Sequence, residues 1–246
     1  MSGLYASASV AIRDDLAAAH ARAWERIGRP GTWWDGAARL AIAAETRYAS
    51  SCRLCRRRKE ALSPAAIEGI HDSLVELSEV VVEVVHRVRN DPSRLSERWY
   101  HGVIAAGLSE EQYVETVSVV AHIVAIDTMA CGLGLDALPL PHPQPGAPSQ
   151  YRPVAAKPGG AWAPWLEPAD LSEAEADLYP SGQAAANIMK AMSLVPDEVR
   201  GFFDLVSHQY MPPLAMRDFS REYRAISHSQ IELLAARISA LNQCLY

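Results

Sequence analysis

The stretch Ser109–Gly134, SEEQYVETVSVVAHIVAIDTMACGLG, decides the fold because it predicts the longest apolar helix of the chain. Ser109 and Gln112 stand at the spacing of a capping box, in which each side chain bonds the backbone N–H of the other residue. No helix breaker follows until Gly132 and Gly134, and glycine commonly ends helices. We therefore expect one long helix at the centre of the fold.

The apolar run Val117–Leu135 within this stretch is long enough to cross a bilayer. His122 and Asp127 interrupt it, and polar groups are costly inside a membrane. We therefore predict a buried helix, with His122 as a hydrogen-bonded core histidine and Asp127 in an internal pair. The segment Met1–Val10 has no basic or apolar region of a signal peptide, so we expect a cytoplasmic protein without a membrane partner.

The rest of the chain also indicates helices, so the predicted class is all-α. The segment 78–90 is rich in valine, but its valines recur at helical spacing and its charged residues occupy the opposite face. No hairpin signal accompanies it anywhere in the sequence. Further helices are expected at 4–27, 34–49, 52–62, from 64 onward, 92–107, 181–193, 196–209, 215–226 and 227–243.

A proline-rich segment divides the chain. Prolines recur throughout 136–170 and forbid a continuous helix or a central strand there. We predict an extended connector, in which Trp162 and Trp165 pack on a surface. The predicted organisation is a first helical domain at 1–135, the connector at 136–170 and a second, incomplete helical domain at 171–246.

Composition limits the partners that the protein can have. The chain has 246 residues, of which 49% are hydrophobic and 21% charged, with a net charge of −6. These values are ordinary for a globular protein with a sizeable core. The acidic balance argues against a nucleic-acid partner, since the basic run at 56–59 is local.

The stretch Ser51–Lys59, SCRLCRRRK, carries the chemistry that the sequence suggests. Cys52 and Cys55 lie at the predicted start of a helix and precede four cationic residues. Helix N-termini and nearby cations both favour the thiolate over the thiol. A redox dithiol is the preferred interpretation, with half of a zinc site and a pair of inert thiols as the alternatives.

The metal interpretation is disfavoured at this stage because two further ligands are missing. Cys131 and Cys244 are isolated, and the histidines show no paired spacing. His71 and His86 fall on polar faces, where we expect them to be solvated. Cys131 is expected to be a small buried hydrophobic residue. We therefore predict no metal and no cofactor.

An internal repeat relates the two ends of the chain. A shift of 192 residues places Glu232 on Leu40, Ala235-Ala236 on Ala43-Ala44, and Cys244 on Cys52. The apolar spacing agrees between the two segments, which indicates two copies of one helical unit.

The spacing around Cys244 resembles a known family. Glu232 and Cys244 are separated by eleven residues, as in the Glu–Cys–Cys–His pattern of the alkylhydroperoxidase D-like proteins, in the carboxymuconolactone decarboxylase superfamily. The segment from Ser193 to Leu234 is similar to its peroxidase-related two-domain branch. Cys52 and Cys55 match the cysteine pair in the first copy, where Leu40 and Lys59 replace the family's glutamate and histidine.

The resemblance implies a thiol-dependent peroxidase-like oxidoreductase with peroxiredoxin-type activity. The second cysteine attacks a hydroperoxide, the first condenses with it to a disulfide, and an external thiol restores the pair. Carried over, Cys55 is peroxidatic and Cys52 resolving, while Glu232 is the general base and Cys244 the resolving thiol of the second copy. Glu45 is a candidate substitute base for the first copy. The family also implies a homo-oligomer.

The sequence ends two residues after Cys244, where the pattern requires its second reactive residue. We therefore expect a chain truncated relative to the intact protein. Some relatives carry selenocysteine at that place, so a selenocysteine codon read as stop is one hypothesis, beside a chosen boundary or a frameshift. The alternative function is a catalytically degenerate redox sensor or structural protein; a non-redox decarboxylase is disfavoured by the Cys52–Cys55 pair.

Overall fold

The computed structural model describes residues 4–180, 185–212 and 214–242, and these residues form an all-α fold. They contain no named strand; a single antiparallel bridge joins Lys157 and Trp165. The helices are α1 (Asp14–Gly28), α2 (Gly36–Tyr48), α3 (Arg53–Glu60), α4 (Glu79–Asn90), α5 (Glu97–Ala105), α6 (Glu110–Gly132), α7 (Asn187–Met192), α8 (Pro196–Gln209) and α9 (His228–Leu241).

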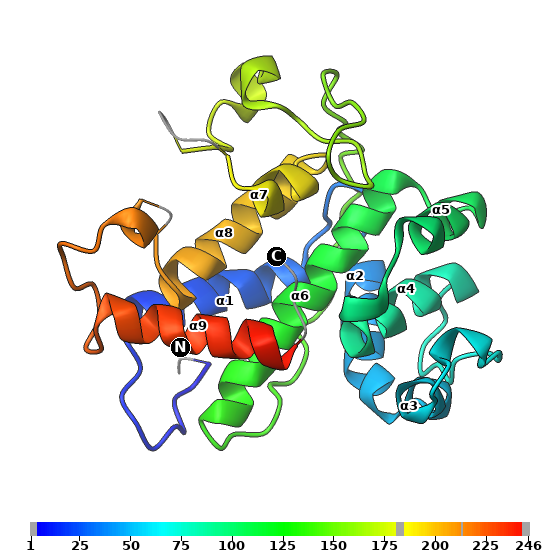
Figure 1. The fold of residues 1–246 in the computed structure, drawn as a ribbon, viewed down its shortest axis with the longest axis horizontal. Helices are drawn as coiled ribbons and strands as arrows, with labels where there is room; N and C mark the ends of the chain where they lie inside the picture. The colour runs from blue at the N-terminus through cyan, green and yellow to red at the C-terminus, as the bar shows by residue number, and fades with distance from the viewer. Residues whose placement is uncertain (1–3, 181–184, 213, 243–246) are drawn as a thin grey trace.

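Helix α6 runs through the middle of the molecule, with α1 and α8 on one side and α2 and α4 on the other (Figure 1). Its capping box is present, since the Ser109 and Gln112 side chains each bond the backbone amide of the other residue. Val119, Ile123 and Ile126 pack into the main core with residues of α1, α2, α4 and α8. The central position predicted for this helix is therefore confirmed.

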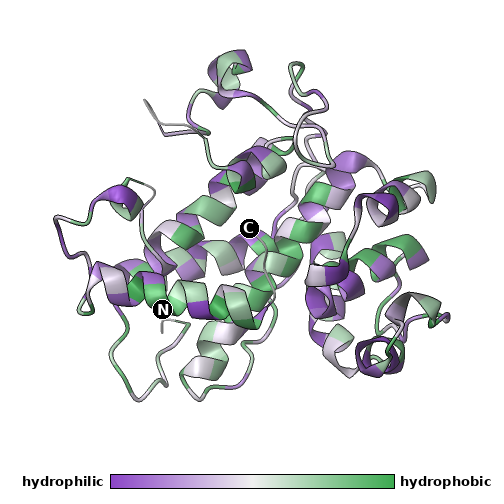
Figure 2. Ribbon diagram, viewed as in Figure 1, coloured by the Kyte–Doolittle hydropathy of each residue, from purple (hydrophilic) through white to green (hydrophobic). Residues whose placement is uncertain are grey.

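The apolar length of α6 is explained by this burial. The helix is long and apolar enough to cross a membrane, yet 56% of its most apolar window is buried inside the fold. Such burial is typical of the core helix of a soluble protein. Figure 2 shows α6 coloured as hydrophobic along most of its length, whereas α3 is strongly hydrophilic.

A buried ion cluster joins α2, α6 and α8. Arg39 of α2 pairs with Glu115 of α6 and, at 2.8 Å, with Glu198 of α8, although all three side chains are at most 1% exposed. Arg26 of α1 adds a second cation to Glu198 at 2.7 Å, and Ser118 donates a hydrogen bond to it. Burial raises the pKa of Glu198, but the two guanidinium groups lower it by more, so this carboxylate is charged.

The structure corrects two predicted helices. The first helix begins at Asp14 and not at residue 4, because Tyr5 folds back and its hydroxyl meets His20 Nδ1 at 2.6 Å. The helix predicted at 215–226 is only a 3-10 turn, Ala215–Arg217. Beyond it, Asp218 accepts the Ser220 amide and the Tyr223 hydroxyl, and such local side-chain bonds compete with helix formation.

Two further segments are less helical than predicted. After Ser63, only the 3-10 turn Pro64–Ala66 forms before α4 begins. Of the helix predicted at 181–193, residues 181–184 lie outside the described part, and among the described residues only Asn187–Met192 are helical. The proline-rich segment has no helix before the turn Pro168–Asp170. Of the two tryptophans predicted to pack within it, Trp165 is buried, whereas Trp162 is 38% exposed.

We predict that Arg39→Ala destabilises the protein by about 3–5 kcal/mol, because it leaves Glu115 and Glu198 buried with a lost partner. The free energy of unfolding in denaturant at neutral pH measures this loss. Arg22→Ala is the control, since Arg22 pairs with Asp204 on the surface and such pairs contribute about 1 kcal/mol or less. Equal losses in the two variants would contradict the structural role of the cluster.

Candidate functional site

The two thiols of the Cys52–Cys55 pair lie at the start of α3. Cys52 is the N-cap residue of this helix and has an extended backbone, while Cys55 lies in the first turn. The short 3-10 helix Ala49–Ser51 connects this start directly to the end of α2. The Cys52 side chain is buried, with the residue 1% exposed, whereas Cys55 is half-buried. Cys55 is therefore the thiol that a small molecule reaches more easily.

Two histidines contact the thiols. The Nδ1 atom of His71 lies 3.4 Å from both sulfur atoms, and the Nδ1 atom of His86 lies 3.4 Å from the sulfur of Cys55. The two imidazole rings are themselves 4.3 Å apart. The structure thus gathers two thiols and two imidazoles from three separate segments of the chain.

The prediction that His71 and His86 are solvated is wrong. The side chain of His86 is fully buried and that of His71 is only 5% exposed. His86 belongs to the buried face of α4, next to Val82 and Val85, and this face is wider than its valine spacing suggests. His71 lies in the loop between the turn at Pro64–Ala66 and α4, and this loop folds back over the start of α3.

Each histidine has a carboxylate on its other ring nitrogen. Glu45 Oε1 lies 2.7 Å from His86 Nε2, and the second oxygen of Glu45 accepts the Leu74 amide at 2.9 Å and the Ser73 hydroxyl at 3.1 Å. Glu45 is fully buried in the last turns of α2, so its carboxylate holds both the imidazole and the loop. The sequence had pointed to this glutamate as a substitute base.

Glu83 plays the same part for the other histidine. One of its oxygens lies 2.8 Å from His71 Nε2 and 3.4 Å from Arg58, and the other accepts the indole N–H of Trp99 at 3.0 Å. Nothing in the spacing of the sequence had indicated Glu83. Both imidazoles therefore present Nδ1 to the thiols and Nε2 to a carboxylate, and this common arrangement fixes the orientation of both rings.

The basic residues of α3 fasten the loop to the helix. Arg53 pairs with Asp72 at 2.6 Å, and the amide of Arg53 donates to the same carboxylate. Arg58 donates to the Ile67 carbonyl at 3.1 Å. The side chain of buried Leu54 lies against Gly69, whose φ of 150° is favoured only for glycine. These contacts keep His71 in place above the thiols.

The surroundings shift the proton affinities in this cluster. Burial lowers the pKa of His71, but its contacts with Cys55, Glu83 and Cys52 outweigh burial and raise that pKa to about 10. Burial dominates at His86 and lowers its pKa. Burial raises the pKa of Cys52, but hydrogen bonds from the Cys55 amide and His71 lower it by more. These shifts favour the thiolate form of Cys52 beside a protonated His71.

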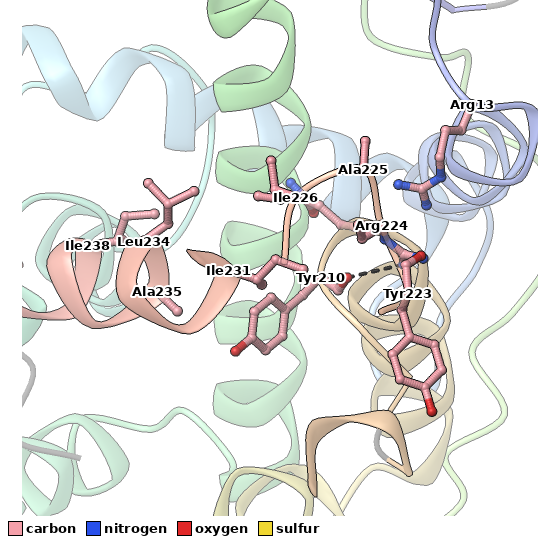
Figure 3. Close-up of a pocket in the computed structure, with 11 residues that line it drawn as sticks. Arg13, Tyr210, Tyr223, Arg224, Ala225, Ile226, Ile231, Leu234, Ala235 and Ile238 are labelled. Atoms are coloured by element: carbon pink, nitrogen blue, oxygen red, sulfur yellow. Dashed lines mark hydrogen bonds between the residues drawn. The ribbon is translucent and has the colours of Figure 1, made fainter. Parts of the chain in front are cut away.

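Glu232 of the second predicted site is not brought to these thiols. Glu232 lies on α9, where it accepts a 2.5 Å hydrogen bond from the Tyr210 hydroxyl, and Figure 1 shows α9 apart from α3. Tyr210 and Ile231 line a cavity of about 700 Å³, and no cysteine or histidine is among the described residues that line it (Figure 3). Cys244 lies outside the described residues. We assign the candidate site by its chemistry, to the thiol cluster.

Three other predicted residues have clear places. His122 is buried, and its Nδ1 atom lies 2.8 Å from the Ser118 carbonyl, as expected of a core histidine. Asp127 forms the predicted internal pair, with Arg47 at 2.7 Å. The prediction for Cys131 is wrong: this cysteine is exposed near the end of α6, beyond the part of the helix that the core covers.

A smaller cavity adjoins the cluster. It has a volume of about 270 Å³, and His71, Glu83 and Val82 are among its lining residues, although neither thiol is.

In comparisons with known proteins, no family model, curated protein or solved structure matches this chain. The resemblance to the alkylhydroperoxidase D-like family therefore stays a prediction based on residue spacing.

We predict that, in the native reduced protein, a bulky maleimide labels Cys131 at least about tenfold faster than Cys52. Cys131 is exposed, while labelling of Cys52 requires local opening, and 1.4 kcal/mol of opening free energy already corresponds to a factor of ten. Peptide mass spectrometry after timed labelling measures both rates, and unfolding in guanidinium should make them similar. Equal rates in the native protein would contradict the burial of Cys52.

Proposed function

We propose that Cys52 and Cys55 form a redox dithiol that reduces hydroperoxides. The observation that carries the proposal is the pair of histidines at Cys55: its sulfur lies 3.4 Å from one nitrogen of His71 and 3.4 Å from one of His86. Each imidazole has a carboxylate behind it. Such a chain of groups can take up the thiol proton and return it at the right moment.

The proposed reaction has two steps. The Cys55 thiolate attacks the outer oxygen of a hydroperoxide, the O–O bond breaks, and the alkoxide takes the thiol proton to leave as an alcohol. The Cys52 sulfur then displaces hydroxide from the Cys55 sulfenic acid, and its proton completes a water molecule. The hydroperoxide gains two electrons and the dithiol becomes a disulfide. An external thiol reductant restores the pair by exchange.

The exposure and contacts of the two cysteines support their order in the reaction. Cys55 is the more exposed thiol and the only one that contacts both histidines, which suits the residue that attacks the peroxide. Cys52 is buried beside it, with its sulfur within 4.8 Å, which suits the resolving thiol. The cavity next to His71 leaves room for a small hydroperoxide near the cluster.

The proposal also includes a homo-oligomeric assembly, which the family resemblance implies.

The burial of Cys52 favours one alternative, a redox sensor that oxidises without rapid turnover. A protein reductant must reach one sulfur of the disulfide, and in the reduced form Cys52 is covered and Cys55 is only half-exposed. Repeated consumption of hydroperoxide with a dithiol reductant supports the peroxidase, whereas a single oxidation per chain supports the sensor. Thiols that do not react with hydroperoxide would contradict both.

We predict that limited hydroperoxide, added to reduced, chelator-treated protein, joins Cys52 and Cys55 in a disulfide. Cys55→Ser should abolish this reaction, because the attacking sulfur is lost. Cys52→Ser should leave a sulfenic acid on Cys55 that dimedone traps. Intact-mass and peptide mass spectrometry detect both products, and Cys131→Ser serves as the matched control that oxidises normally. Sulfenic acid on Cys52 in the Cys55→Ser variant would reverse the assigned roles.

We also predict that His86→Gln slows the oxidation of Cys55 by roughly 10²–10⁴-fold, the usual contribution of a positioned acid or base. Stopped-flow measurement of thiol loss gives the second-order rate constant. His101→Gln is the control, since His101 is exposed on α5. An unchanged rate in a folded His86→Gln variant would show that this histidine moves no proton in the reaction.

A further inference from the structure

We propose that Cys52, Cys55, His71 and His86 also form a tetrahedral zinc site. Their four ligand atoms, the two sulfurs and a ring nitrogen from each histidine, lie within 4.8 Å of one another. The three sulfur–nitrogen contacts among them are each 3.4 Å. Zinc bonds of about 2.3 Å to sulfur and about 2.0–2.1 Å to nitrogen, at tetrahedral angles, separate neighbouring ligand atoms by roughly 3.3–3.8 Å. Three of the six donor pairs therefore already have the separation of zinc ligands, and the other three lie within 4.8 Å, so a small approach of the side chains would complete the site.

The outer contacts are those of a metal centre. Histidines that bind metals commonly donate their second ring N–H to a carboxylate, which fixes the tautomer and the ring orientation. Glu83 and Glu45 accept from the Nε2 atoms of His71 and His86 at 2.8 and 2.7 Å, so that both Nδ1 atoms face the thiols. Both carboxylates carry further hydrogen bonds, from Trp99 and from the Leu74 amide. This repeated arrangement is an observation separate from the gathering of the four donors.

The choice of zinc follows from the donors. Thiolate sulfur and imidazole nitrogen in a tetrahedral set favour zinc, whereas magnesium and calcium prefer oxygen ligands. Two thiolates neutralise the charge of the ion, which suits a site with a fully buried His86 and a buried Cys52. Four protein ligands leave no open coordination position, so the site is of the structural type.

The loop that carries His71 gives the ion a structural task. Residues 67–76 have no helix, and Ile70 and Leu74 within them are largely exposed, so apolar packing contributes little to the position of this part of the loop. A bound ion would join this loop to α3 through the cysteines and to α4 through His86. Metal binding then adds to folding stability, because the unfolded chain has no such preformed site.

The zinc site does not rest on the proposed peroxidase function, but the two are linked. A sulfur that forms the disulfide has lost the thiolate charge that binds zinc, so the ion and the disulfide are alternative states of one cysteine pair. Zinc-loaded protein should therefore form the disulfide more slowly than chelator-treated protein. Bound zinc would protect the reduced dithiol from oxidation.

Cobalt substitution tests the proposal directly. The full chain, reduced and freed of metal with a chelator, is titrated with Co²⁺ and then with Zn²⁺. We expect the intense visible bands of tetrahedral cobalt and a thiolate-to-cobalt charge-transfer band, both saturating at one ion per chain and both removed by Zn²⁺. Weak bands of octahedral cobalt, or the absence of a thiolate band, would overturn the proposal without any variant.

Variants locate the ion. Cys55→Ser should abolish the tetrahedral spectrum, and Glu45→Gln should weaken zinc binding by roughly 10–100-fold, as loss of an outer-shell carboxylate does. Cys131→Ser is the control and should bind as the original chain does, with circular dichroism confirming that each variant is folded. An unchanged spectrum in folded Cys55→Ser would overturn the site. Failure of the metal-free protein to react with hydroperoxide would contradict the peroxidase proposal alone.

Discussion

The buried guanidinium of Arg39 is the constraint on which the arrangement of the helices depends. It holds α2 between Glu115 of α6 and Glu198 of α8, and Arg26 ties α1 to the same carboxylate. Charged groups that are buried away from water need such partners. Removal of one partner lowers the stability of the fold by more than the intact pair adds to it. Because α2 also carries Glu45 near its other end, the position of this helix sets the position of the carboxylate that holds His86 and the loop.

In the thiol cluster, as around Arg39, buried polar groups are stabilised by pairing with one another. Its polar groups are buried, and each imidazole is satisfied on both sides, by sulfur at Nδ1 and by a carboxylate at Nε2. Networks of this kind are rigid only when every member has its partners. The same preorganisation would suit either the proposed proton relay or the proposed metal site, which is why one group of residues supports both proposals. Metal and disulfide exclude each other because both use the electrons of the two sulfurs.

Two of the places where helix prediction failed, near the N-terminus and after Arg217, share a physical cause. Helices with a strong start signal agree with the structure: α6 and α9 begin at capping boxes, and α8 begins at Pro196. The segments 4–13 and 218–226 have suitable composition but are held by specific side-chain contacts of Tyr5 and Asp218. Contacts of single side chains leave no periodic signal, so spacing alone cannot reveal them.

The sequence by itself determined the helical class, the buried central helix, the cysteine pair at a helix start and the importance of Glu45. These features follow from periodicity, from caps and from short spacings, which are local properties of the chain. Only the tertiary structure decided that His71, His86 and Glu83 belong to the same site. His71 comes from a loop without periodicity, and His86 and Glu83 come from a helix face with partly polar sequence. The folding of that loop over α3 brings them to the thiols. The metal interpretation, disfavoured by sequence because two ligands were missing, returns for this reason.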